Sequence, residues 1–146
     1  MAVTANPQLT IVLPAYEEAA NLENLLPRLA EVASQLVEQA PRLPEGRLAL
    51  QAAAAGGTVG VAGGRPALPP ESLAQFEILV VDTPMPRDET PIVCKKHGAR
   101  YLPRRGGSLY GHAIRTALEE ARGEWVIFMD ADGSHNPGFL PDLWRY

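Results

Sequence analysis

The chain has 146 residues, enough for about one domain with a buried core, and its 46% hydrophobic and 21% charged residues are typical of a globular protein. Its net charge of −4 argues against a nucleic-acid-binding protein, since such proteins usually carry a clearly basic face. The single cysteine, Cys94, excludes an internal disulfide and indicates a reducing compartment, and we expect it to be a small buried apolar residue.

Neither a membrane span nor a leader is visible in the sequence. No uninterrupted apolar run approaches the ~18 residues that a membrane span requires. The N-terminus, MAVTANPQLT, has neither a basic start nor an apolar core, so it is not a secretory signal. These observations predict a cytoplasmic protein.

The first predicted elements are a buried strand and a long helix. The apolar run in LTIVLPAY ends at Pro14 and predicts a strand at about Leu9–Leu13. Glu17 and Glu18 then open a helix, because acidic side chains are favourable near the positive end of the helix dipole. The apolar stripe of this helix, with residues three and four apart, consists of Leu22, Leu25, Leu26, Leu29, Val32 and Leu36.

Residues 39–75 interrupt the pattern. The segment is rich in Ala, Gly and Pro and has few large apolar residues. A connection of this length is unusual inside a compact domain. We interpret it as a flexible surface insertion, and the alternative is a lid or a segment that docks a partner.

A second strand and a short helix follow the insertion. FEILVVD predicts a buried strand at Phe76–Val81. Thr90 then caps a short helix that begins at Pro91 and ends at Gly98. The stretch ARYLP predicts another short strand directly after it.

The last part of the chain repeats the alternation. A helix covers about Tyr110–Arg122, and EWVIFMD predicts the final strand. Asn136 followed by Pro137 is typical of an N-cap and the first position of one more helix. This order of strands and helices indicates an α/β protein with a mostly parallel sheet flanked by helices.

Polar residues follow three of the predicted strands. Tyr16 and Glu18 follow the first strand, Asp82 the second, and Asp130 and Asp132 the last. Ligands of parallel sheets bind beyond the carboxyl ends of the strands. We therefore expect these side chains to converge on one edge of the sheet.

Asp130 and Asp132 flank one small residue, Ala131, directly after the final strand. Their oxygens are hard ligands of the kind that hold Mg²⁺ or Mn²⁺. Such a metal bridges to the phosphates of a nucleotide and neutralises charge as a diphosphate leaves. The alternative interpretation is that the two aspartates merely form an Asx turn after the strand.

Four stretches, taken in order, resemble the family 2 glycosyltransferases with the GT-A (Rossmann-like) fold, and among them the dolichol-phosphate mannosyltransferase group. The resemblance covers the chain apart from residues 39–75. The matching stretches are IVLPAYEEAANL, EILVVDTPMPRDET, RRGGSLYGHAIRTALEEARGEWVIFMDAD and DADGSHNPGFLPDL.

The resemblance implies a role for each matching position. Asp132 would be the catalytic residue through the Mn²⁺ or Mg²⁺ that it holds together with Asp130, and Ser134 stands where the family supplies a further metal ligand. The positions expected to contact the nucleotide sugar are Pro14, Ala15, Tyr16, Glu18, Asp82, Asp88, Arg105, Gly111, Asp130 and Ala131.

The sequence departs from the family pattern at several positions near the expected nucleoside. Glu17 stands in the position of the usual Asn, and Thr83 replaces the second of two paired aspartates. Arg87 is an extra residue before Asp88, and Glu89 stands where a glycine is usual. Guanine and uracil therefore both remain open as the base of the donor.

The resemblance implies a metal-dependent, inverting enzyme that moves a hexosyl group from a GDP- or UDP-sugar to a polyprenyl (dolichyl-type) phosphate, peripherally at a membrane surface. In this family the acceptor half follows the nucleotide half, so residues 1–146 would form the donor part of a GT-A domain, truncated after the Asp-x-Asp motif. We expect a second copy or a partner chain to cover the open edge strand.

Two other functions remain open at this stage. One is a non-catalytic half-domain that binds a nucleotide sugar or a partner. The other is a phosphohydrolase of the haloacid dehalogenase type, because DADGS also resembles the nucleophile motif of that family.

Side chains near the motifs also have plainer interpretations. Arg104 and Arg105 could form a solvated pair, and His97 and His112 look like surface residues. We expect His135 to order the turn that follows the aspartates.

Overall fold

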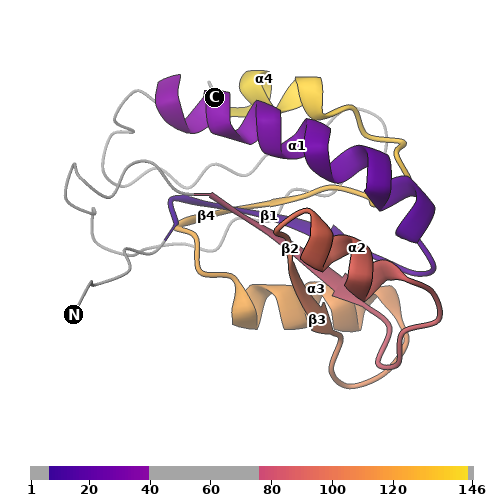
Figure 1. The fold of residues 1–146 in the computed structure, drawn as a ribbon. Coiled ribbons are helices and arrows are strands. Elements are labelled where there is room, and N and C mark those ends of the chain that lie inside the picture. The colour runs from indigo at the N-terminus through magenta and orange to yellow at the C-terminus, as the bar shows by residue number, and fades with distance from the viewer. Residues whose placement is uncertain (1–6, 40–75, 145–146) are drawn as a thin grey trace, which may run out of the picture.

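The computed structural model describes residues 7–39 and 76–144, so the predicted insertion lies, apart from Gln39, outside the described residues. Within the described part, four parallel strands form one sheet in the order β3-β2-β1-β4 (Figure 1). This confirms the predicted parallel α/β sheet. The strands are β1 (Leu9–Pro14), β2 (Phe76–Asp82), β3 (Arg100–Pro103) and β4 (Trp125–Phe128).

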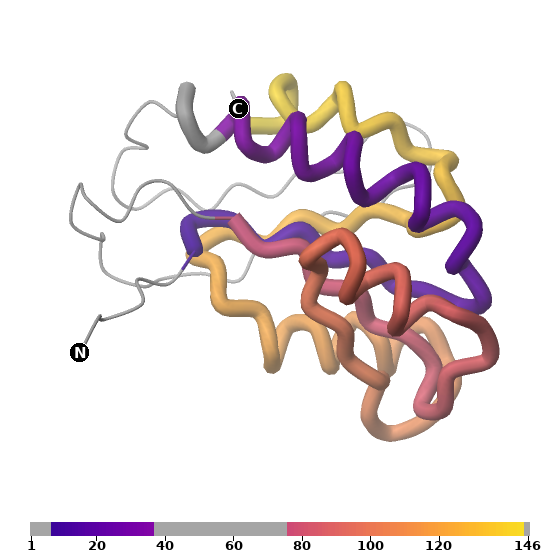
Figure 2. The backbone as a smooth tube through the Cα atoms, in the orientation of Figure 1, coloured from indigo at the N-terminus to yellow at the C-terminus, as the bar shows by residue number. Residues whose placement is uncertain are grey.

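Helices cover both faces of this sheet. Helices α1 and α4 lie on one side of the sheet and α3 on the other (Figures 1 and 2). Helix α2 packs in the same core layer as α1 and α4, through Val93 and Cys94. None of the helices in the described part is long and apolar enough to cross a membrane. The elements are α1 (Ala19–Gln39), α2 (Thr90–Lys96), α3 (Tyr110–Glu120), η2 (Pro137–Phe139) and α4 (Leu140–Trp144).

The apolar runs form strands because both faces of the sheet are buried. Every residue of β1 is buried, and alternate side chains belong to opposite layers of the core. Ile11 and Leu13 pack in the layer under α1, whereas Val12 packs in the layer under α3. The thiol of Cys94 is also fully buried, as predicted, and burial together with the charge of Asp82 raises its pKa to about 12.

The helix starts differ from the prediction. Helix α1 begins at Ala19, after Glu17 has taken a left-handed φ of 57°. Thr90 is the first residue of α2 and does not cap it. The carboxylate of Asp88 accepts hydrogen bonds from both Ala19 N (2.8 Å) and Thr90 N (2.9 Å). One acidic side chain therefore caps two helices that start far apart in the sequence.

The carboxyl ends of the strands lie side by side, as expected. Pro14 pairs with Val81 of β2, and Val12 pairs with Phe128 of β4. The chain leaves β1 toward β2 and β3 and returns to the other side of β1 to form β4. The point between β1 and β4 is thus a topological switch point, where sheets of this class leave a crevice for a ligand.

Candidate functional site

The two aspartates sit in a turn at this switch point. Ala131 between them is buried, and the amide of Asp130 donates to His135 Nδ1 (3.0 Å). Asp132 Oδ1 accepts from the amide of Ser134 (2.8 Å), which is an Asx turn. The predicted role of His135 in ordering the turn is confirmed, and the Asx turn leaves both carboxylates at the end of β4.

Both aspartates have oxygens suited to a divalent cation. Hydrogen bonds from Ser134, through its side chain and its amide, lower the pKa of Asp132 and favour its carboxylate form. In the described ranges, no group of three His, Cys, Asp or Glu side chains could hold a metal. This donor set fits Mg²⁺ or Mn²⁺ bound by one or two carboxylates, with phosphate oxygens and water as the other ligands.

The turn after β1 provides an exposed aromatic ring over a buried floor. Pro14 and Ala15 are buried, while Tyr16 is 49% exposed. Glu18 accepts a hydrogen bond from Asn21 Nδ2 (2.6 Å) at the start of α1. Tyr16 and Glu18 are thus accessible at the predicted edge, whereas Pro14 and Ala15 shape it from below.

The acids that follow β2 are used inside the protein. Asp82 is 1% exposed, and its oxygens accept from Thr83 N (2.7 Å) and Tyr101 Oη (3.2 Å). Contact between Asp82 and a base would require one of these bonds to be exchanged. Burial alone would raise the pKa of Asp88, but hydrogen bonds from Ala19 and Thr90 outweigh it and lower the pKa.

Arg105 does not lie with the aspartates in this structure. Its guanidinium pairs with Glu119 (2.9 Å) and Glu120 (3.0 Å) of α3. Gly111, by contrast, is exposed, and the space around it is open. The contacts of Arg105 and Gly111 with a nucleotide sugar stay predictions.

The glycine loop before α3 closes over a histidine. Gly106 and Gly107 have φ values of 87° and 141°, and a Cβ on Gly106 would lie 2.8 Å from His112 Nδ1. His112 is half-buried under this loop, so it is less exposed than its prediction as a surface residue implied. His97 is also half-buried, with Nε2 3.2 Å from Glu23 Oε2.

Arg104 is a site residue that the sequence did not reveal. It is only 6% exposed, which contradicts the solvated Arg104–Arg105 pair. Its Nε donates to Asp82 O (3.0 Å), Nη1 to Ser108 O (2.9 Å) and Nη2 to Ala15 O. The guanidinium therefore ties together the ends of β1 and β2 and the glycine loop. Only its place beside the loop in the sequence hinted at such a role.

Tyr110, at the start of α3, lies close enough to the aspartate turn for the charge of Asp130 to act on it. Burial and the charge of nearby Asp130 raise the pKa of Tyr110, the first residue of α3. Leu109 before it is 73% exposed. The structure thus assembles four segments around the ends of β1, β2 and β4: residues 14–18, 82–88, 104–111 and 130–135.

Comparison with protein families agrees with this geometry. Residues 71–146, just over half of the chain, match the family model described as glycosyl transferase family 2. The match includes β2, β3, β4 and the aspartate turn, whereas β1 and the turn after it lie outside the matched residues. This match decides between the two families that the aspartate motif resembles, in favour of the glycosyltransferases and against a haloacid dehalogenase-type phosphohydrolase. The chain belongs to glycosyltransferase family 2, with a GT-A-like α/β fold, and is a glycosyltransferase that uses a nucleotide-sugar donor.

Proposed function

We propose that the protein is the donor-binding part of a metal-dependent, inverting hexosyltransferase that uses a GDP- or UDP-sugar. The observation that carries the proposal is the aspartate turn at the switch point between β1 and β4. Asp130 and Asp132 place hard oxygen ligands where a bound nucleotide would present its diphosphate. Within this proposal, Asp130 and Asp132 would hold Mn²⁺ or Mg²⁺, which would neutralise charge on the leaving diphosphate.

The side chains around the turn would hold and orient the donor. Asp132 is favoured as a carboxylate by Ser134, so it is ready to bind a cation at neutral pH. The exposed ring of Tyr16 offers a surface for the nucleoside, and Glu18 offers acceptor oxygens for hydroxyl or amino groups. Positioning of this kind, with electrostatic stabilisation, supplies most of the catalysis in transfers of charged groups.

A polyprenyl phosphate is the acceptor class that we propose. Its phosphate oxygen is already ionised at neutral pH, so the transfer needs no general base from this part of the chain. The stretch after Asp132, GSHNPGF, resembles the dolichol-phosphate mannosyltransferase group. The exposed Leu109, beside the residue that lies near Asp130, provides an apolar contact suited to a lipid chain. This acceptor implies a protein that works peripherally at a membrane surface on the cytoplasmic side.

Calorimetric titration tests the proposal. The 146-residue chain is titrated with GDP and with UDP, each with and without Mn²⁺. We expect at least one nucleotide to bind in a Mn²⁺-dependent manner, and Asp132→Asn to weaken that binding by about tenfold or more. Asp142→Asn, which changes an exposed aspartate of α4, is the matched control and should bind as the wild type does.

The outcomes separate the remaining alternatives. Unchanged Mn²⁺-dependent affinity in Asp132→Asn would refute the role of the aspartate turn. Donor binding without any hexosyl transfer to polyprenyl phosphate would instead support the non-catalytic, nucleotide-sugar-binding half-domain. Transfer that is lost in Asp132→Asn and kept in Asp142→Asn would support the enzyme.

A further inference from the structure

Two departures from the family pattern meet in the structure. In the resemblance described under Sequence analysis, Glu17 stands in the position of the usual Asn, and Arg87 is an extra residue before Asp88. Arg87 Nη1 lies 3.4 Å from Glu17 Oε1 and donates to Tyr16 Oη at 2.6 Å. The guanidinium also lies over the Tyr16 ring, 5.4 Å from its centroid. The two unusual residues thus form one cluster with the exposed aromatic ring of the site.

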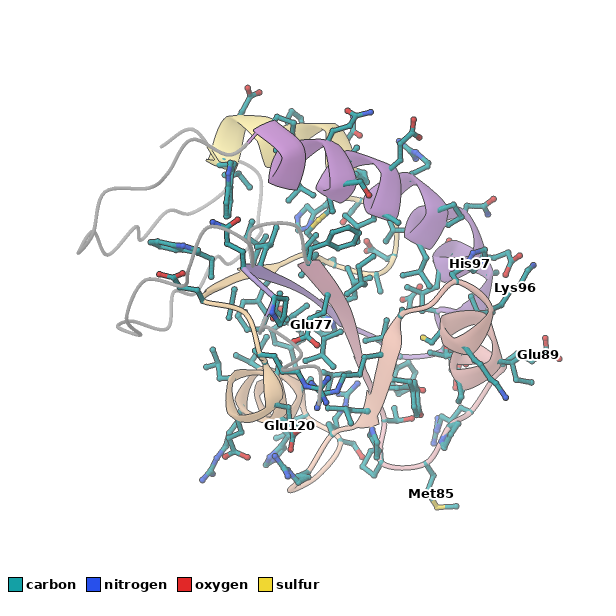
Figure 3. All side chains as sticks on the ribbon, turned by 60° about the vertical axis from the view of Figure 1, so that its left-hand side comes forward. Glu77, Met85, Glu89, Lys96, His97 and Glu120 are labelled. Atoms are coloured by element: carbon teal, nitrogen blue, oxygen red, sulfur yellow. The ribbon has the colours of Figure 1, made fainter. Side chains whose placement is uncertain are left out.

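The backbone around this cluster is arranged to present these side chains. Glu17 keeps a left-handed φ of 57°, which is uncommon for a residue other than glycine, and such outliers concentrate at functional sites. Pro84 and Pro86 restrict the loop that carries Arg87. The loop is fixed at one end by Thr83, whose hydroxyl donates to Met85 O, and at the other by Asp88. Figure 3 shows Met85 projecting outward from this loop.

The pair between Glu17 and Arg87 is available to a ligand. Their side chains are 48% and 58% exposed, and an exposed ion pair contributes little to stability. In the described part of the chain, no hydrogen bond uses Nε or Nη2 of Arg87. Glu18, in contrast, is held by Asn21 at 2.6 Å. Arg87 and Glu17 therefore offer free donors and exchangeable acceptors side by side.

The hydrogen-bond donors of Arg87, next to the acceptor oxygens of Glu17, are complementary to the edge of guanine. The base presents the acceptors N7 and O6 and, next to them, the donors N1–H and N2–H₂. Arginine donates in pairs to O6 and N7, and a carboxylate accepts two parallel N–H bonds. Uracil offers a single N–H between two carbonyl oxygens, so a carboxylate gains one bond and faces two acceptors. The aromatic ring below provides a stacking surface for either base.

We propose that Glu17 and Arg87, supported by Tyr16, read the base of the donor and select a guanine nucleotide over a uracil nucleotide. The inference rests on the proposed function, because it assumes that the nucleoside lies at the edge formed by the turns after β1 and β2. It assigns the base, which the family resemblance left open, and it assigns the choice to residues outside the aspartate turn.

The test compares GDP, UDP and IDP, which is GDP without the N2 amino group. Calorimetry with Mn²⁺ should give about tenfold or tighter binding of GDP than of UDP to the wild-type chain. Loss of the N2 bond should weaken IDP severalfold relative to GDP. Glu17→Gln should shrink both ratios toward one, and Arg87→Gln should lower GDP affinity with little effect on UDP.

The controls separate recognition from folding. Arg115→Gln removes an exposed arginine that pairs with Glu119 on α3, and it should leave all three affinities unchanged. The urea midpoint of each variant is measured in parallel. It should stay close to that of the wild type, because Glu17 and Arg87 are both exposed. Equal GDP and UDP affinity, a preference for UDP, or ratios unchanged in both variants would overturn this inference alone. No Mn²⁺-dependent binding of any nucleotide would overturn the proposed function and this inference with it.

Discussion

Arg104 offers the sharpest test of how the site is held together. Its guanidinium bonds the carbonyls of Ala15, Asp82 and Ser108, which belong to three different segments of the site. Lysine at this position keeps the positive charge but has one ammonium group, which cannot reach three divergent carbonyls at once. Arg104→Lys therefore changes the geometry of donation while leaving the net charge as it is.

The expected loss follows from the bonds that disappear. At least two carbonyls lose a charged donor in a place where water cannot replace it, because Arg104 is buried. A hydrogen bond to a charged group contributes about 1.5–3 kcal/mol, so the loss of two should lower the free energy of unfolding by about 3–6 kcal/mol. A domain with about 10 kcal/mol of stability, the middle of the usual range of about 5–15 kcal/mol, remains folded after such a loss. The freed ends of β1 and the glycine loop should weaken Mn²⁺-dependent nucleotide binding about tenfold.

Arg100→Lys is the matched control, at the start of β3, whereas Arg104 directly follows the end of that strand. Arg100, at the opposite end of β3, donates to Glu120 O and Glu120 Oε2 at 2.8 Å each and lies 3.5 Å from Glu77. Figure 3 labels both of these glutamates. Arg100 is partly exposed, so its substitution should cost about 1–2 kcal/mol and leave nucleotide affinity unchanged.

Urea unfolding followed by circular dichroism measures the stability, and calorimetry measures the affinity. A loss below about 0.5 kcal/mol in Arg104→Lys would mean that the three hydrogen bonds do not hold the segments together. Equal loss of nucleotide affinity in Arg104→Lys and Arg100→Lys would show that affinity merely follows stability. A tenfold loss confined to Arg104→Lys would support its role in positioning the site.

Three further predictions concern stability and reactivity. Asp88→Asn should lower the free energy of unfolding by about 1–2 kcal/mol at pH 7. The pKa of Asp88 is lowered in the folded chain, so its stabilisation is present above the unfolded pKa near 3.9 and is lost as the pH falls through the folded pKa. The urea unfolding curves of wild type and variant should therefore converge in acid. Gly106→Ala should cost about 1–3 kcal/mol, since its φ is 87° and its Cβ would meet His112, whereas Gly111→Ala, which meets no atom within 4 Å, should stay within about 1 kcal/mol of the wild type in the same assay. The Cys94 thiol, with its pKa raised to about 12, should react with a thiol reagent at pH 8 only as fast as the chain unfolds, and rapid labelling of the folded protein would contradict its burial.

Periodicity in the sequence was enough to predict the architecture. The continuous apolar runs identified the strands because a sheet covered on both faces needs apolar residues at every position. The three- and four-residue spacing of the leucines in α1 identified the helix face that is buried. The aspartate turn followed from its place after a strand, since the carboxyl ends of parallel strands meet at one edge.

The contacts that shape the site could not be predicted in the same way. Asp88 caps α1 from a loop that follows β2, and Arg87 reaches Tyr16 across a similar distance in sequence. These bonds join residues that are neighbours only after the sheet has formed. Thr90 has the composition of a cap, yet α2 begins one residue earlier than predicted, so Thr90 is the first helical residue and its amide donates to the carboxylate of Asp88.

The central place of β1 has a consequence for the order in which the protein folds. Leu9 pairs with Phe76 on one side and with Trp125 on the other, so neither neighbour of β1 is close to it in sequence. The β2–α2–β3 unit, where Leu79 pairs with Arg100, closes a much shorter loop. Because long loops carry a larger entropic cost before any pairing rewards them, this unit should form first. During synthesis, β1 is made before both of the strands that pair with it. Its six residues, which are buried in the folded protein, therefore remain exposed to solvent until β2 has been synthesised.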